Sequence, residues 1–466
     1  MTKVAQPGAS WSDILSRKYA SKILTLVLAV WLHASNSMLT STTMPGAVSE
    51  IGGLNLLHWT FSLYLVGSII AGASISIIVM RTSIRNAMIG AALVYAIGAA
   101  IVALAPDMII VLLGRVLQGL GGGALMGLVY VSQERFFPPH FVPRIIACIS
   151  MTWMLAAFCG PMIGGAFTTW GIWRMAYWVF AMQALLLAVA IRLLLPVEKT
   201  DPAQLAEHIP VVRLSLLAVA IVLVSMAGAS FDALLSPLLV LCGFIALVFF
   251  IFRDRSAQRS RLLPEGVTSL RHPLGNGVLT IFLLCLCIMS FLVYAPTILI
   301  KLHGLSAFTA GLVVMMETVG WGVAAIIFSG LSSDREPALI RSGSALIILG
   351  LCGLSVSLPN GPLWTIILTG LLCNAGFGMM WGFIIKRVVG SAEKQDKNRA
   401  AALLPMTLQT GFALGAALSG IIANSLGLGL SVDADGLKRI AFWIFAGFIP
   451  IAMLGNVFAW RFVRAS

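Results

Sequence analysis

One acidic residue, Glu317, lies deep within a run of apolar residues and is the first candidate for chemistry. It sits midway along the apolar stretch 306–331, whereas the other acidic residues fall in polar connections or near the ends of such stretches. A low-dielectric surrounding favours the neutral acid unless a partner stabilises the carboxylate. Such a group can take up and release protons as its surroundings alternate between wet and dry, so we expect Glu317 to carry protons. The alternative is a protonated acid that only hydrogen-bonds a neighbouring helix.

The apolar stretch 23–46 carries a second polar surface. His33, Asn36 and Thr40 are spaced three or four residues apart, so they share one side of a helix. We place only His33, of the six histidines, inside an apolar stretch. We expect it to titrate or to contact a substrate; the alternative is a packed histidine whose hydrogen bonds are satisfied.

Arg115 lies inside the apolar stretch 108–132, roughly 10 Å from its start at the rise of a helix. A cation at that depth must face protein or water, and Gln118 follows one turn later on nearly the same side. The glycines that follow allow another helix to approach closely. They also loosely match a dinucleotide-binding fingerprint, which we exclude because no strand precedes them.

A proline flanked by glycines interrupts the stretch 144–168. Pro161 removes a backbone donor and kinks a helix, while Gly160, Gly164 and Gly165 permit tight packing beside the bend. We expect a hinge here, with a static kink as the alternative.

Several tryptophans lie well inside apolar stretches, with methionines close by in sequence. Met and aromatic faces accept varied ligands, so these side chains suit an adaptable apolar cavity. The substrate contacts that we expect are Trp31, Asn36, Thr40, Gln118, Trp153, Trp321 and Trp381.

These residues must be positioned by membrane-spanning helices. The chain is 59% hydrophobic and 10% charged, and runs long enough to cross about 30 Å of hydrocarbon recur throughout. The expected spans are 23–46, 56–80, 87–105, 108–132, 144–168, 175–196, 211–229, 234–252, 274–300, 306–331, 342–358, 363–385, 401–424 and 440–460. The sequence therefore predicts an all-α polytopic membrane protein with fourteen spans.

Basic residues gather in alternate connections, which predicts a cytoplasmic (inner) membrane location with both termini in the cytoplasm. The net charge of +13 is explained by this topology and by anionic lipid headgroups, so we expect no nucleic-acid partner. Spans 211–229 and 234–252 look like an inserted, lipid-facing hairpin without intramembrane charge; removing it leaves two six-helix halves. The expected divisions are a cytoplasmic segment 1–22, a bundle 23–196, a linker 197–273 containing the hairpin 211–252, and a bundle with a short cytoplasmic tail 274–466.

An intramembrane enzyme would need a nucleophile–base pair or metal ligands at membrane depth. Only Glu317 and His33 are titratable at that depth, on distant spans, and no His/Cys/Asp cluster accompanies them. We therefore expect no enzyme activity, no metal and no cofactor. A passive channel would want rings of like polar residues, which isolated charges do not supply.

Two of these segments together resemble the major facilitator superfamily, most closely its drug:proton antiporter family with fourteen spans. The fourth-span motif of that family is matched by Arg115-x-x-Gln118-Gly119-x-Gly121-x-Gly123, and the fifth-span antiporter motif by Gly160-Pro161-x-x-Gly164-Gly165. Trp173-Arg174 follows where the family often has Trp-Arg. The resemblance covers essentially the whole chain and implies two helical halves plus a hairpin, a role for Arg115 in proton coupling, and export.

The chain departs from the family pattern in two places. After the second span, Gly72 and Arg81 remain of the loop motif, and Ser76 stands where the gate aspartate would be. We expect Asp334 and Arg335, in the matching loop of the later half, to take part of that gating role. In the first span Asn36 replaces a titratable aspartate, which leaves Glu317 as the main proton carrier, modulated by Arg115 and His33.

We therefore expect a monomeric secondary transporter that exports an apolar or amphipathic small molecule in exchange for protons. The alternative, kept open by both departures, is an importer or metabolite exporter of similar build with different coupling.

Overall fold

The computed structural model describes residues 16–138, 141–196, 211–229, 235–257, 263–329, 335–393, 396–428 and 433–465. Over these residues the chain is almost entirely helical and contains no strand. Fourteen helical segments are long and apolar enough to cross a membrane, which confirms the expected all-α polytopic architecture. Most of the segment 1–22 and the first part of the linker 197–273 lie outside the described residues.

Six helices form the first bundle: α2 (Arg17–Ile51), α3 (Trp59–Arg81), α4 (Ile84–Leu104), α5 (Met108–Phe136), α6 (Val142–Thr169) and α7 (Trp173–Leu194). A short 3-10 turn, η1 (Leu54–Leu56), leads into α3. The second bundle contains α10 (Pro273–His303), α11 (Ala307–Ser329), α12 (Glu336–Asn360), α13 (Leu363–Ser391), α14 (Lys397–Ser425), α15 (Ala434–Ala446) and α16 (Ile449–Ala465). The hairpin between them consists of α8 (Val211–Ala229) and α9 (Leu235–Arg255).

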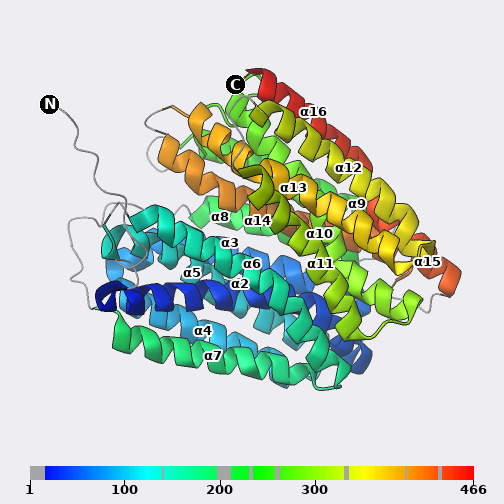
Figure 1. Cartoon of the computed structure of the whole chain (residues 1–466), viewed down its shortest axis with the longest axis horizontal. Coiled ribbons are helices and arrows are strands. Elements are labelled where there is room, and N and C mark those ends of the chain that lie inside the picture. The colour runs from blue at the N-terminus through cyan, green and yellow to red at the C-terminus, as the bar shows by residue number, and fades with distance from the viewer. Residues whose placement is uncertain are drawn as a thin grey trace.

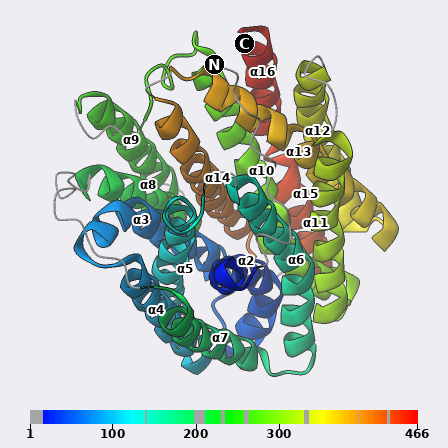
Figure 2. The same ribbon diagram turned by 60° about the vertical axis from the view of Figure 1, so that its left-hand side comes forward.

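The start of α2 and the end of α16 lie on the same side of the molecule, which we call the terminal side; the opposite side is the far side. Figure 1 shows the two bundles converging towards the far side and diverging towards the terminal side. Figure 2 shows α2 nearly end-on in the middle of the molecule, where it contacts helices of its own bundle as well as α10 and α11.

Helices α6 and α11 make the most extensive contact between the bundles. A Cβ on Gly311 would lie 2.4 Å from the Pro161 carbonyl oxygen, so only a glycine allows the two backbones this close. Nearer the far side, the Phe308 amide donates a hydrogen bond to Thr169 Oγ1 over 2.9 Å. The far side is therefore closed by direct backbone-level packing.

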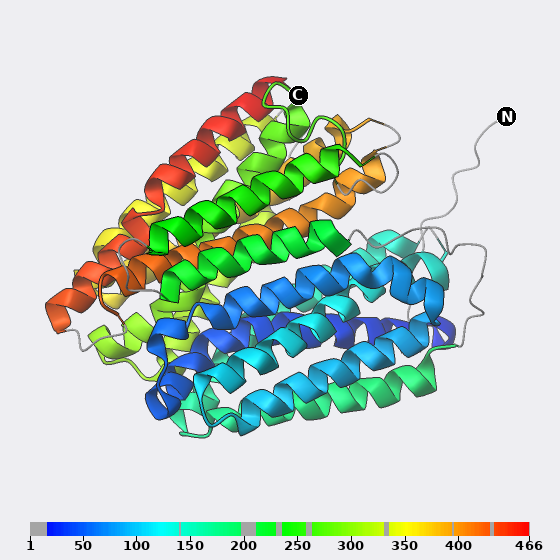
Figure 3. The same ribbon diagram turned by 180° about the vertical axis from the view of Figure 1, so that it is seen from behind.

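The hairpin differs from the expected lipid-facing pair. Helix α9 does face outwards over most of its length, but α8 packs along α14 of the second bundle and also against α3 of the first (Figure 3). Arg213 and Asp254 form a buried ion pair at its terminal-side end. The expectation of a lipid-facing hairpin was wrong for α8, because much of this helix is buried against α14 and α3. The pairing of Arg213 with Asp254 lets both charges be buried at the hairpin's end.

The last expected span, 440–460, is longer and broken. Two helices, α15 and α16, meet around Gly447 and Phe448, and the span begins at Ala434 after Asp433 caps α15 by accepting a hydrogen bond from the Gly436 amide. Charged Lys438 and Arg439 had shortened the apolar run in the sequence.

Candidate functional site

Arg115 is fully buried in the first bundle and holds three helices together. Its Nε donates to the Thr60 carbonyl oxygen over 2.9 Å, and its Nη1 donates to Asn36 Oδ1 over 2.9 Å and to Gln118 Oε1 over 2.8 Å. The guanidinium lies 4.3 Å from the ring centre of Tyr64, a cation–π distance. The structure therefore brings together Arg115, Gln118 and Asn36, of which Gln118 was expected on the same side as Arg115.

Two tyrosines complete this polar core, and the sequence analysis missed both. The Tyr64 hydroxyl lies 2.8 Å from His33 Nδ1, and the Tyr95 hydroxyl accepts a hydrogen bond from Asn36 Nδ2. Thr40 Oγ1 donates to the Asn36 carbonyl oxygen over 2.9 Å. Both tyrosines are buried in apolar helices, so nothing in the sequence distinguished them from packing aromatics.

In the part of the chain that the structure describes, only neutral groups contact the Arg115 cation. Its described contacts are a backbone carbonyl, two side-chain amides and an aromatic face, with no carboxylate among them. Within the described residues, Arg115 Nη2 and Gln118 Nε2 have no hydrogen-bond partner. Among the described residues, therefore, no carboxylate contacts the buried Arg115 cation, and the neutral Asn36 amide accepts one of its hydrogen bonds.

Glu317 is buried between α11 and α13 of the second bundle, with only 6% of its surface exposed. It packs on Gly370, where a Cβ would lie 2.6 Å from Glu317 Oε1. The side chain of Asn374, one turn further along α13, interacts with the carboxyl group. Oε1 has no hydrogen-bond partner among the described residues. Glu317 is therefore an acid in a largely apolar interface, with the Asn374 amide as a polar neighbour.

Aromatic rings lie next to Glu317. Trp321, one turn along α11, lies 4.8 Å from Phe377, and Phe377 stacks on Trp381 at 5.1 Å between ring centres. Trp321 and Trp381 remain partly exposed. The two expected tryptophans are thus adjacent, and Phe377 joins them; its burial within an apolar helix had hidden it.

The remaining expected contacts lie in the first bundle. The edge of Trp153 meets the His33 ring at 5.8 Å between centres, which places Trp153 beside the polar core. Trp31 is partly buried on α2, and its carbonyl oxygen accepts a hydrogen bond from Ser35. Glu317 lies in a different bundle from Arg115 and His33, and the structure shows no direct contact between the acid and either of them.

A polytopic fold of two helix bundles with a buried acid in one and a buried arginine in the other suits a transporter, and comparison with known proteins decides the family. The family model described as Major Facilitator Superfamily matches residues 26–392. The chain belongs to the Major Facilitator Superfamily. It is therefore a membrane transporter and not an enzyme.

Relatives within the superfamily carry export names. The chain is 29% identical over 468 residues to a probable multidrug-efflux transporter of Mycobacterium tuberculosis, covering 96% of each chain. It is 25% identical over 304 residues to the multidrug efflux pump SdrM of Staphylococcus aureus, covering 64% of this chain and 66% of the relative. A dehydrocurvularin exporter of Aspergillus terreus is 21% identical over 438 residues, covering 86% and 75%.

Solved structures of the superfamily share the fold. A peptide transporter bound to sulfate matches with a TM-score of 0.69 at 14% identity, covering 98% of this chain and 97% of the other. An inward-facing bacterial homologue of the human lysosomal transporter Spinster matches with a TM-score of 0.67 at 12% identity, covering 97% and 98%. At these identities the likeness concerns the fold alone.

The glycine–proline motif of α6 serves close packing. A Cβ on Gly160 would lie 2.7 Å from Met38 Cβ, and one on Gly164 would lie 2.3 Å from Thr42 Oγ1, so both glycines admit α2. Gly165 faces the other bundle, where its Cβ would lie 2.6 Å from the Ala307 carbonyl oxygen. The Pro161 carbonyl oxygen accepts a hydrogen bond from Thr42 over 3.0 Å. The motif thus places α6 between α2 and α11, while its role as a hinge stays a prediction.

The expected gate residues of the second bundle are described only in part. Asp334 lies outside the described residues, and Arg335 is exposed at the start of α12. The next residue, Glu336, is buried and pairs with Lys386 at 2.7 Å and Arg387 at 3.1 Å. The sequence analysis missed Glu336 because its basic partners lie about fifty residues further along the chain.

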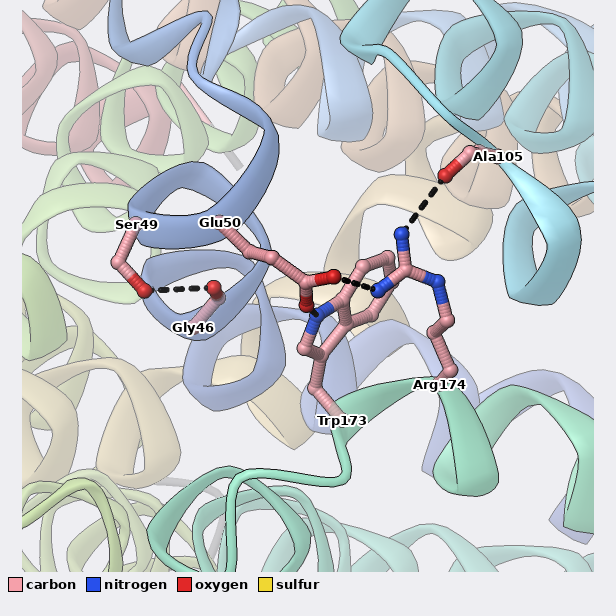
Figure 4. Close-up of polar contacts among 6 residues, drawn as sticks. All are labelled: Gly46, Ser49, Glu50, Ala105, Trp173 and Arg174. Carbon is pink, nitrogen blue, oxygen red and sulfur yellow. Dashed lines mark hydrogen bonds and ion pairs between the residues drawn. The ribbon is translucent and has the colours of Figure 1, made fainter.

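A superfamily-like Trp-Arg pair lies at the far side of the first bundle (Figure 4). Trp173 Nε1 donates to Glu50 Oε2 over 2.7 Å, and Arg174 pairs with the other carboxylate oxygen. Arg174 Nη2 also donates to the Ala105 carbonyl oxygen over 2.9 Å. These contacts tie the far-side ends of α2, α4 and α7 into one unit.

Proposed function

We propose that this transporter exports apolar or amphipathic small molecules in exchange for protons. The observation that carries the proposal is Glu317, buried with one unpartnered oxygen beside the Trp321, Phe377 and Trp381 rings. An acid in an apolar interface can change protonation when its exposure to water changes, and aromatic faces bind apolar and amphipathic ligands. The export names of the most similar relatives support the direction.

In this mechanism residues 23–196 and 274–466 move as two bodies about a site near the middle of the membrane, with 197–273 joining them. Protonation of Glu317 from outside favours substrate release, and its deprotonation towards the cytoplasm restores the binding form. Arg115 and His33 modulate this step from the first bundle, since the hydrogen-bond network that contains them lies on helices that contact the second bundle. The pump works as a monomer surrounded by lipid.

We further propose that the terminal side is cytoplasmic. Basic side chains such as Arg85, Arg192, Arg461 and Arg464 lie at that side, in keeping with the excess of positive charge on cytoplasmic faces. Because the bundles converge at the far side, the described conformation corresponds to one that opens towards the cytoplasm.

The test is proton release by the purified, detergent-solubilised protein when lipophilic cations and neutral compounds are added. Wild type should release protons on binding, and Glu317→Gln should bind without release. Glu393→Gln, which changes an exposed acid at the terminal side, is the matched control and should behave as wild type. Equal proton release by the Glu317→Gln protein would remove Glu317 from the mechanism.

A second candidate function is import, or export of one metabolite, with a different coupling. Asn36 cannot titrate, and the relative from Aspergillus terreus is named for a single product, dehydrocurvularin. Transport driven by an imposed pH gradient in oriented vesicles separates the two: a proton antiporter moves cargo against the inward proton flow, whereas an importer moves cargo with it.

A further inference from the structure

Three parts of the chain meet at the far side, away from Glu317 and Arg115. They are the connection before α3, from Asn55 to His58; the end of α8, from Ser225 to Gly228; and the end of α14, from Gly420 to Asn424. The first belongs to the first bundle, the second to the inserted hairpin and the third to the second bundle. The sequence analysis placed no role at any of these residues.

His58 links the first bundle to the hairpin. Its Nε2 lies 3.0 Å from the Ser225 carbonyl oxygen, and since a carbonyl only accepts, Nε2 carries the proton and donates it. The side chain is fully buried, and it lies near the start of the expected span 56–80 and within the apolar segment Leu54–Gly72 of the structure. The expectation that His33 was the only histidine inside a span was therefore wrong.

Asn424 connects all three parts through a single amide group. Its Nδ2 donates to the Asn55 carbonyl oxygen over 2.7 Å and to the Gly228 carbonyl oxygen over 2.5 Å. One side chain of α14 thus uses both amide hydrogens, one on each of the other two parts.

Two glycines shape the slot that holds the His58 ring. A Cβ on Gly420 would lie 2.4 Å from His58 Cγ, and one on Gly228 would lie 2.8 Å from His58 Nε2. The ring therefore fits only while α8 and α14 keep these positions free of side chains.

The hairpin is joined within itself at its terminal-side end and packs mainly on the second bundle. Arg213 of α8 pairs with Asp254 of α9, and the other carboxylate oxygen of Asp254 accepts a hydrogen bond from the Leu263 amide over 2.8 Å. Leu263 lies in the connection that leads into α10. Helix α8 packs more extensively along α14 than along α3, which associates the hairpin with the second bundle more closely than with the first.

We propose that the hairpin is a latch for the far-side gate: it moves with the second bundle and grips the Asn55–His58 connection of the first bundle whenever the far side is closed. Opening to the far side then requires release of the His58–Ser225 and Asn424–Asn55 hydrogen bonds, whereas the Asn424–Gly228 bond stays within the moving unit. The inference presupposes that the two bundles move relative to each other, but it does not depend on proton coupling or on Glu317.

The test measures the distance between spin labels at Ser49 of the first bundle and Lys301 of the second, both exposed at the far side. The full chain, with its native cysteines replaced by alanine, is reconstituted in lipid and examined by double electron–electron resonance. Wild type should favour the short distance. Asn424→Ala and Gly420→Ala should raise the ratio of long to short distances about tenfold, the effect expected on losing one or two hydrogen bonds.

Two matched controls keep the test decisive. Gly90→Ala adds a methyl group where nothing lies within 4 Å and should leave the distances unchanged. His58→Gln keeps an N–H donor where His58→Ala removes it, so the Gln variant should stay closed while the Ala variant opens. Unchanged distances in His58→Ala and Gly420→Ala would show that the hairpin only packs against the bundles and does not act as a latch. Because the spin-label distances do not depend on proton movement, a negative result with Glu317→Gln would not contradict the latch proposal.

Discussion

Single residues set the electrostatics of this transporter, and the most unusual of them is Arg115. A fully buried guanidinium normally has a carboxylate partner, yet here it is surrounded by neutral acceptors and one tyrosine ring. The position of Arg115 deep within an apolar stretch predicted that it must face protein or water. It could not predict Tyr64 or Tyr95, because a buried tyrosine looks the same in sequence whether or not its hydroxyl serves a network.

Substitutions of Asn36 test how far the buried Arg115 cation depends on this neutral acceptor. Asn36→Asp gives Arg115 a charged acceptor, and a hydrogen bond to a charged group contributes about 1.5–3 kcal/mol, so we expect a higher thermal unfolding midpoint. Asn36→Leu keeps the branched shape of the side chain but leaves Arg115 Nη1 with one acceptor fewer, at a cost of about 1–3 kcal/mol, and should lower the midpoint. The measurement is thermal unfolding in detergent. A Leu variant as stable as wild type would show that Arg115 does not rely on Asn36.

At the scale of elements, hydrophobic runs predicted which segments are helices but not what each helix touches. The spans were found in number and order, since length and apolarity decide membrane crossing. The burial of α8 and the break between α15 and α16 were missed. The burial of α8 depends on long-range partners, α3 and α14, which no local pattern in its own sequence encodes.

The ion pair between the two hairpin helices gives a prediction at the scale of elements. Asp254→Asn removes the charged acceptor of Arg213 in this ion pair; breaking a buried pair costs about 3–5 kcal/mol, so the thermal unfolding midpoint should fall markedly. Replacing both residues together, Arg213→Met with Asp254→Leu, removes the stranded charge and should recover part of the loss. Unfolding of the three proteins in the same detergent provides the comparison. If the double variant is less stable than Asp254→Asn, the ion pair contributes more to the free energy of unfolding than is lost by burying the Arg213 charge without Asp254.

In the whole molecule the two bundles pack against each other at the far side, and each bundle has its own group of buried polar residues. Glu317 and its aromatic neighbours lie in the second bundle, while the Arg115 network lies in the first. The sequence identified Glu317 with two of its tryptophans, and Arg115 with some of its partners, but treated them as one coupling system. Which residues share a bundle interior depends on how α2, α3 and α5 pack together, and periodicity in a single helix does not report that.

The orientation of the whole molecule in its membrane is the remaining prediction. Trp170 is 68% exposed at the far side, and Glu393 is exposed at the terminal side. The excess of Lys and Arg on the terminal side should hold it in the cytoplasm, because translocating basic loops is unfavourable. In intact cells, a membrane-impermeant maleimide should therefore label a cysteine at position 170 and not one at position 393, in a background whose native cysteines are replaced. Lysed cells should label both, which controls for accessibility. The reverse pattern would place the latch on the cytoplasmic side and make the described conformation one that opens outwards.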